Sequence, residues 1–146
     1  MTDNITHELT AVPIQLVPFL WEEVTPILQR VVDISDGDIS NATVLDRIMA
    51  GNSLLIVVTE KEGGAMVAIF TIEIRTMDTG KRVLYAPIIA GDEMKGWLED
   101  MCQFLLKTAL HEKCVQIRGI SARKGWIRAL KKYGLIEGTT TVSYKL

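Results

Sequence analysis

Apolar residues follow two spacings along the chain, one typical of strands and one typical of helices. Runs rich in β-branched and apolar residues predict strands over residues 11–16, 53–60, 65–75, 81–90, 114–119 and 139–145. Apolar positions three and four residues apart predict helices over residues 18–32, 41–50, 94–112 and 123–133. The resulting order is β-α-α-β-β-β-α-β-α-β. It predicts an α/β (α+β) fold with a mixed, mostly antiparallel sheet flanked by helices.

Two prolines lie inside predicted elements. Pro26 lies within the first helix and predicts a kink there, or two shorter helices. Pro87 lies at the centre of the strand over 81–90 and has no N–H to donate to a neighbouring strand. Something must therefore interrupt strand pairing near Pro87, either an edge or bulge position or a strand that leaves its neighbour.

The same periodicities predict which side chains form the core. We expect ten residues to be largely buried: Leu55, Val57, Val67, Ile69, Leu84, Trp97, Met101, Leu105, Ile117 and Leu130.

Length and composition predict one ordinary globular domain. The chain has 146 residues, of which 48% are hydrophobic and 23% charged, with a net charge of −2. We expect a polar tail over residues 1–10 and a single domain over 11–146. No apolar run approaches the roughly 20 residues that span a bilayer, and the N-terminus lacks the apolar segment of a signal peptide. The sequence therefore predicts a cytoplasmic protein without membrane contact.

The two cysteines do not indicate a metal site. Cys102 and Cys114 lack the spacing of metal ligands. We interpret both as reduced thiols in or near the core, because cytosolic proteins rarely carry structural disulfides.

The segment from Gly125 to Leu135 reads GWIRALKKYGL. It resembles the last helix of the GNAT N-acyltransferase superfamily, which ends in a Tyr-x-x-x-Gly-Phe turn before a final strand. The predicted order of elements resembles this superfamily over nearly the whole chain. The segment is more specifically similar to small GNAT-like proteins of tailed bacteriophages, in which a Gly-Trp helix closes the chain.

The resemblance implies a site for acyl-CoA, with acetyl-CoA as the possible cofactor. In the family, the fourth strand pairs with the pantetheine arm, and the following loop and helix N-terminus hold the pyrophosphate, as unpaired amides and a helix dipole favour. The implied cofactor-binding residues are Ile88, Ile89, Ala90, Gly91, Lys95 and Gly96. The fourth strand must then separate from the strand over 114–119 near Pro87.

Several positions depart from the family pattern. The family loop reads Gln/Arg-x-x-Gly-x-Gly/Ala, and alignment on Gly96 places Glu93 and Leu98 at the other two motif positions. Asp92 and Glu93 bring two negative charges to the expected pyrophosphate site, where they would repel phosphate or merely complement the helix dipole. These departures predict weak acyl-CoA binding.

The implied catalytic residues also differ. Leu130 stands where the family has its general acid, a tyrosine four residues before the glycine that ends the helix. Tyr133 is the alternative acid, and Glu73 is a candidate general base only because it lies on a central strand.

Basic residues gather near the C-terminal end. Between Lys113 and Ile136 there are seven basic residues and no acidic one: Lys113, Arg118, Arg123, Lys124, Arg128, Lys131 and Lys132. Lys124 and Arg128 share one face of the predicted helix. This face is either solvated or binds the 3′-phosphate of CoA, a nucleic acid or an acidic protein.

Three functions remain open. The first is a catalytically degenerate GNAT-fold protein of phage type, acting in a virion or as an assembly or accessory factor through contacts with other proteins or with copies of itself. The second is an acyl-CoA-dependent N-acyltransferase with a divergent CoA loop. The third is a nucleic-acid-binding module using the basic strip over 113–132, which lacks the interleaved aromatic residues of base-stacking surfaces. The degenerate loop favours the first function.

Overall fold

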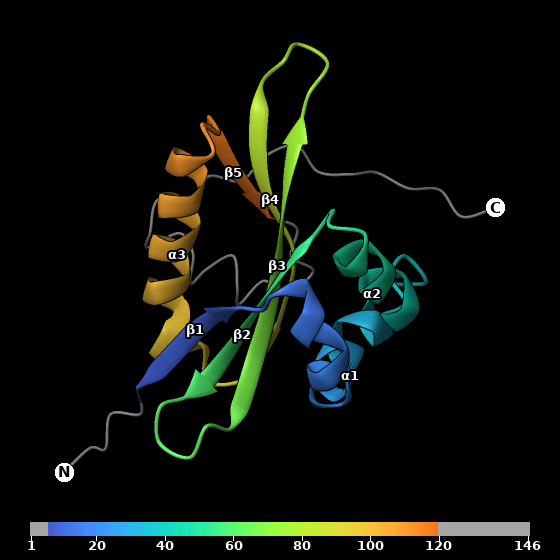
Figure 1. Ribbon diagram of the computed structural model, residues 1–146, viewed down its shortest axis with the longest axis vertical. Coiled ribbons are helices and arrows are strands. Elements are labelled where there is room, and N and C mark those ends of the chain that lie inside the picture. The colour runs from blue at the N-terminus through green and yellow to red at the C-terminus, as the bar shows by residue number, and fades with distance from the viewer. Residues whose placement is uncertain (1–5, 120–146) are drawn as a thin grey trace.

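The computed structural model describes residues 6–119, and the helix and strand predicted beyond residue 119 lie outside this range. The elements, in chain order, are β1 (His7–Ala11), η1 (Ile14–Leu16), α1 (Val17–Ile34), α2 (Asn41–Met49), β2 (Leu54–Glu60), β3 (Met66–Thr76), β4 (Arg82–Gly91), α3 (Met94–His111) and β5 (Gln116–Gly119). Figure 1 shows these elements around a single twisted sheet.

The sheet has five strands in the order β1-β2-β3-β4-β5. The first three pairings are antiparallel, and β5 pairs with β4 in the parallel direction. The parallel pairing requires a crossover, which α3 supplies. The predicted mixed, mostly antiparallel sheet flanked by helices is therefore confirmed.

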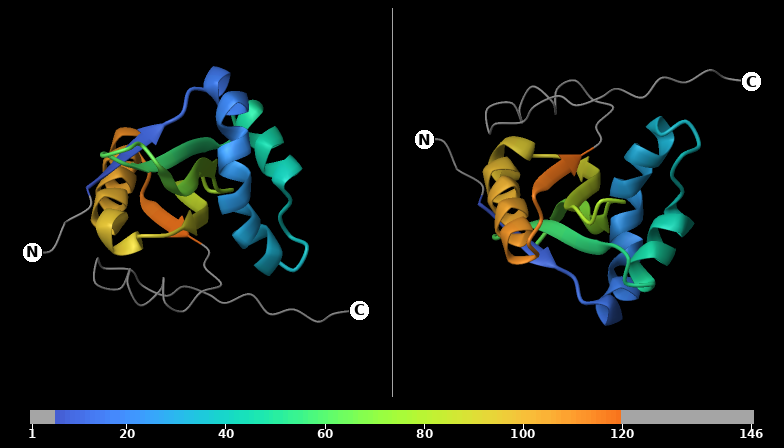
Figure 2. Two further views of the ribbon diagram at one scale, coloured as in Figure 1. Left: turned by 90° about the horizontal axis from the view of Figure 1, so that it is seen from below. Right: turned by 90° about the horizontal axis from the view of Figure 1, so that it is seen from above.

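Helices cover both faces of the sheet, so the described part of the chain has three layers. Figure 2 shows α3 on one face and α1 with α2 on the other. Phe70 and Trp97 belong to the apolar cluster beneath α3, and Ile69 and Leu28 belong to the cluster beneath α1 and α2. Neighbouring β3 residues pack on opposite faces because side chains alternate along a strand.

Most of the predicted core is buried. Seven of the ten expected residues are less than a tenth exposed: Leu55, Val57, Ile69, Leu84, Trp97, Met101 and Leu105. Val67 is partly buried, and Ile117 is 38% exposed because it lies on the short strand β5 at the end of the described sheet. Leu130 lies outside the described residues.

The N-terminal strand differs from the prediction. β1 spans His7–Ala11, all but its last residue within the expected polar tail, and pairs with β2 from His7 opposite Glu60 to Ala11 opposite Ile56. The apolar run expected as a strand instead contains the 3₁₀ turn η1. Main-chain hydrogen bonding to β2 fixes the position of β1, although the sequence of β1 contains few apolar residues.

Helix α1 continues through Pro26 as one helix of 18 residues, rather than as two shorter ones. Pro18 lies in its first turn, where a missing N–H costs nothing. Val24, Ile27 and Leu28 are buried around Pro26. Burial of this face offsets the hydrogen bond that the proline cannot form.

Candidate functional site

Strand β4 contains a bulge at its centre. Its register with β3 shifts by one residue between the pairs Glu73–Tyr85 and Thr71–Ile88. β4 therefore has one residue more than β3 over this stretch, and Pro87 lies within it. A bulge is one of the few places in a sheet that tolerate a proline. The predicted interruption near Pro87 takes this form.

The extra residue reverses the faces of β4. Leu84 and Ala86 pack in the cluster beneath α3, whereas Ile88 and Ala90 pack in the cluster beneath α1 and α2. In a regular strand, four residues spaced by two would share one face. The bulge therefore lets an almost uniformly apolar strand contribute to both cores.

The described pairing of β4 with β5 reaches the bulge. Pairing with β5 runs from Val83 opposite Gln116 to Ala86 opposite Gly119, whereas pairing with β3 continues to Gly91. Within residues 6–119, no strand pairs with the β5 side of residues 87–91. We call this stretch the open β4 edge. Because Gly119 is also the last residue that the structure describes, the predicted separation of the two strands stays a prediction.

The open β4 edge presents main-chain polar groups at alternate residues. The N–H of Asp92 donates to a β3 carbonyl at 2.9 Å. Hydrogen-bonded pairs alternate along an antiparallel ladder, so Ala90 and Ile88 also turn their main chain toward β3. Ile89 and Gly91 turn theirs away from β3. Of the four strand residues predicted to contact the cofactor, only Ile89 and Gly91 thus offer main-chain groups on the open side.

The loop that joins the open β4 edge to α3 has a fixed shape. Gly91 has a φ of +131°, and a Cβ there would lie 2.4 Å from the Cα of Ala68. Glu93 caps the helix in the left-handed conformation. The indole Nε1 of the buried Trp97 donates to the C=O of Asp92 at 2.8 Å. These contacts fix the position of the first turn of α3 relative to the end of β4.

The two acidic residues of this loop have partners. Arg30 of α1 donates to the Asp92 carboxylate at 2.8 Å, and the ring Nε2 of His7 lies 3.3 Å from a Glu93 carboxylate oxygen. The positive charge of the Arg30 guanidinium compensates the negative charge of the Asp92 carboxylate. The sequence did not indicate these partners, which come from α1 and β1.

Two of the other predicted site residues, Lys95 and Gly96, lie in the first turn of α3. Lys95 is exposed in the first turn of α3, and its contact with a cofactor stays a prediction. The N–H of Gly96 donates to the C=O of Glu93 at 2.9 Å, and a Cβ on Gly96 would lie 2.5 Å from the His7 ring. Gly96 thus gives room to His7. Lys124, Arg128 and Tyr133 lie outside the described residues, and their roles stay predictions.

Glu73 is held by two arginines on the sheet face that carries α2. Arg47 of α2 donates through Nε at 3.0 Å and through Nη2, and Arg75 of β3 donates through Nε and Nη2 at 3.2 and 2.8 Å. Burial opposes ionisation of Glu73, but the two arginines outweigh burial and hold its pKa below the ordinary value. A general base must take up a proton near neutral pH. This environment therefore disfavours Glu73 as the base.

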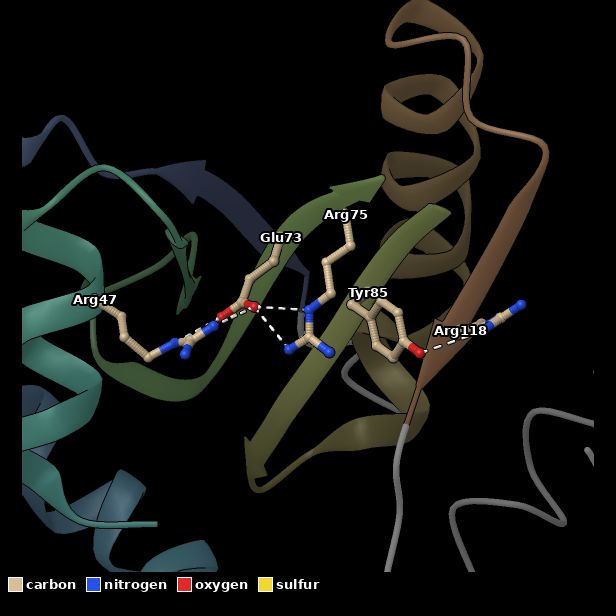
Figure 3. Close-up of polar contacts among 5 residues, drawn as sticks. All are labelled: Arg47, Glu73, Arg75, Tyr85 and Arg118. Carbon is tan, nitrogen blue, oxygen red and sulfur yellow. Dashed lines mark hydrogen bonds and ion pairs between the residues drawn. The ribbon is translucent and has the colours of Figure 1, made fainter. Parts of the chain in front are cut away.

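Tyr85 of β4 continues this row of charged residues. The Arg75 guanidinium lies over the Tyr85 ring, 4.1 Å from its centroid, and Arg118 of β5 donates to the Tyr85 hydroxyl at 3.3 Å. The hydrogen bond from Arg118 lowers the pKa of Tyr85, against the opposing effect of burial. Figure 3 shows the five residues Arg47, Glu73, Arg75, Tyr85 and Arg118 in a row from α2 across the sheet to β5. We call them the Arg–Tyr cluster.

Sequence reasoning singled out only Glu73 from this cluster, and counted Arg118 among the basic residues. Glu73 and Arg75 are two residues apart on a strand, so their shared face was readable. Nothing in the sequence indicates that Arg47 of α2 reaches the same carboxylate, because that contact depends on how α2 packs.

The fold is that of known acetyltransferases. A predicted acetyltransferase with acetyl-CoA from Clostridium acetobutylicum is 13% identical, with a TM-score of 0.66 over 96% of each chain. Glucosamine-6-phosphate N-acetyltransferase from Arabidopsis thaliana is 14% identical, with a TM-score of 0.65 over 96% of this chain and 98% of that one. Ribosomal-protein-alanine N-acetyltransferase from Brucella melitensis biovar Abortus 2308 is 9% identical, with a TM-score of 0.71 over 97% of this chain and 99% of that one. No protein-family model and no curated protein matches the sequence.

These structures correct the functional expectation. The sequence favoured a catalytically degenerate virion or assembly protein, whereas the similar folds are those of acetyltransferases. The expectation was wrong because it took the divergent loop motif and its two acidic residues as signs that the acyl-CoA site had been lost. The strip over 113–132, on which the nucleic-acid alternative rests, lies mostly outside the described residues.

No helix in the described part of the chain is both long enough and apolar enough to cross a membrane.

Proposed function

We propose that the chain is an acyl-CoA-dependent N-acyltransferase of the GNAT superfamily that transfers an acetyl group from acetyl-CoA to an amine. The observation that carries this proposal is the open β4 edge. It begins at the bulge, next to the last described pairing with β5, and it ends at the N-terminus of α3. An extended ligand with an anionic end matches both features.

The arm of acetyl-CoA would take the place of a missing strand. Ile89 and Gly91 turn their N–H and C=O groups toward the open side, so they would pair with amides of the pantetheine arm. The pyrophosphate would then meet the first turn of α3, where the amides of Met94 and Lys95 belong to the unpaired start of the helix. The Lys95 ammonium adds a positive charge there.

The reaction follows from this placement. The acceptor amine attacks the thioester carbonyl carbon, a C–N bond forms, the C–S bond breaks and the CoA thiolate leaves. The N–H of Ile89 lies closest to the bulge among the outward-facing amides and would stabilise negative charge on the carbonyl oxygen. The amine loses one proton, and the thiolate gains one. Tyr133 remains the predicted donor to the thiolate.

The acceptor is not set by the fold. One similar structure is named for glucosamine 6-phosphate and another for the alanine of a ribosomal protein. Unrelated acceptors on one architecture mean that side chains around the site choose the amine.

Isothermal titration calorimetry of the full chain with acetyl-CoA tests the proposal. We expect saturable 1:1 binding with a dissociation constant in the micromolar range, about −8 kcal/mol. Arg30→Gln should weaken binding about twofold to fivefold, because the Asp92 charge near the helix N-terminus loses a compensating partner. The loss should shrink with added salt.

Arg82→Gln is the matched control. Arg82 is another partly exposed arginine, but it pairs with Glu112 at the far end of α3. Its loss should leave the affinity for acetyl-CoA unchanged. The absence of saturable heat up to millimolar acetyl-CoA would contradict the proposed function.

A further inference from the structure

The Arg–Tyr cluster holds more positive charge than its own carboxylate compensates. It contains three guanidinium groups and one carboxylate, that of Glu73, which leaves a net formal charge of +2. Within residues 6–119, Arg118 contacts only neutral partners, the Gln116 side-chain oxygen at 3.0 and 2.9 Å and the Tyr85 hydroxyl at 3.3 Å. An excess of guanidinium groups is typical of sites that bind carboxylate or phosphate.

The arginines are also held in place before any ligand arrives. Glu73 is buried and receives the Nε and Nη2 groups of both Arg47 and Arg75, so the Nη1 groups lie outside these bonds. The side chains of Arg47 and Arg75 are 50% and 41% exposed, so they remain open to solvent on their outer sides. Arg75 lies between Glu73 and the Tyr85 ring (Figure 3). A guanidinium already fixed by a carboxylate and a ring loses little entropy on binding an anion.

The cluster lies where the open β4 edge begins. Tyr85 and Arg118 are directly paired across β4 and β5, one residue before the last pair of that ladder. The bulge at Pro87 follows two residues after Tyr85, which is about 7 Å along a strand. Acetyl-CoA bound as proposed would have its pyrophosphate at α3 and its acyl end toward Pro87. The cluster then lies beyond the acyl end, on the side from which an acceptor approaches.

We infer that the Arg–Tyr cluster is the acceptor-binding subsite, and that the acceptor is an amine carrying a carboxylate or phosphate group. This inference rests on the proposed function, and it adds the substrate class. Arg75 and Arg118 bind the anionic group, with Arg47 widening the positive surface. The anion then holds the amine near the acyl carbon, and proximity of this kind accounts for much of the rate of a two-substrate reaction.

Tyr85 provides an independent optical reporter. Arg118 and Arg75 lower the pKa of its phenol, and a bound anion would offset their charge and bring that pKa back up. The chain has three tyrosines, so the ultraviolet titration of the full chain minus that of Tyr85→Phe isolates this one phenol.

The experiment follows arginine Nε–H resonances by NMR in the full chain without acetyl-CoA. Two pairs of amines that differ in the anionic group are titrated in: O-phosphoethanolamine against ethanolamine, and β-alanine against β-alaninamide. At least one anionic member should shift the Arg75 and Arg118 resonances at millimolar concentration, and should raise the apparent pKa of Tyr85. The pair that responds identifies phosphate or carboxylate as the anchor.

Two variants separate specific binding from general charge. Arg118→Gln keeps the Glu73 ion pairs intact and should weaken the anionic amine at least about fivefold, as expected for a lost charge-assisted hydrogen bond. Arg82→Gln removes an equal charge from the same sheet and should leave that affinity unchanged.

The outcomes separate the two proposals. Equal shifts from anionic and neutral amines, or equal losses in Arg118→Gln and Arg82→Gln, overturn the acceptor subsite even where acetyl-CoA binds. Failure of acetyl-CoA to bind in calorimetry instead removes the proposed function, whatever the arginine resonances do. With both in place, acetylation monitored by thiol release should favour the anionic member of the responding pair.

Discussion

At the scale of single residues, Glu73 shows how a buried charge is stabilised and what that costs the chemistry. Two arginines from different elements satisfy its carboxylate and lower its pKa. The same contacts that permit burial remove the basicity that a catalytic role would require. Glu73 therefore organises Arg47 and Arg75, and its effect on function passes through them.

Replacing Glu73 with glutamine should lower the free energy of unfolding by about 1–2 kcal/mol at pH 7, since the arginine partners are about half exposed and partly screened. The lowered pKa of Glu73 means that this contribution is fully present above its ordinary value of 4.5. It is lost as the pH falls below that value and through the folded-state pKa. Urea unfolding of both proteins between pH 7 and pH 3 should show the difference shrink. A difference that grows toward acid would contradict the assignment.

A second prediction at the scale of single residues concerns the backbone conformation of Gly91. Its φ of +131° belongs to a region that other residues rarely adopt, and a Cβ would also meet β3 at 2.4 Å. Gly91→Ala should therefore cost more than about 2 kcal/mol of unfolding free energy. Gly80→Ala is the control, because its φ is +88° with open space around it, and it should cost about 1–2 kcal/mol. Equal costs in chemical denaturation would show that the β3 contact is unimportant.

At the scale of elements, the sequence predicted those helices and strands whose structure is determined by their own residues. The hairpins β2–β3 and β3–β4 and the helix α3 were readable, because each carries its own turn signals or apolar periodicity. β1 could not be predicted, because pairing with β2 stabilises this strand and its own sequence contains few apolar residues. Pro87 signalled an interruption, but the one-residue bulge and the reversal of faces were hidden, because β4 is apolar on both sides of it.

The packing of α3 can be tested with two adjacent leucines. Leu105 is 7% exposed and belongs to the cluster under the helix, whereas Leu106 is 53% exposed. Leu105→Ala should cost roughly 2–5 kcal/mol, and Leu106→Ala less than about 0.5 kcal/mol. Thermal or urea unfolding of the two variants measures the difference. A cost below about 1 kcal/mol for Leu105→Ala would mean that α3 does not pack through this face.

At the scale of the whole molecule, the bulge in β4 links the fold to the proposed activity. It follows Ala86, the last β4 residue with a described β5 partner, and the open β4 edge runs from it to the start of α3. The sequence predicted an interruption of pairing near Pro87, and the bulge confirms it. It did not predict that the loop acids would be engaged by His7 and Arg30, because those partners come from β1 and α1, far away in the chain.

The most direct test of the proposed function is an NMR titration of backbone amides with acetyl-CoA. The outward-facing N–H groups of Ile89 and Gly91 should shift strongly and become protected from solvent exchange. The N–H groups of Ile88 and Ala90, which turn toward β3, should change little. Such an alternating response requires a ligand paired along the open β4 edge. Shifts spread evenly over residues 88–91, or confined to residues elsewhere in the chain, would contradict the proposed binding of acyl-CoA.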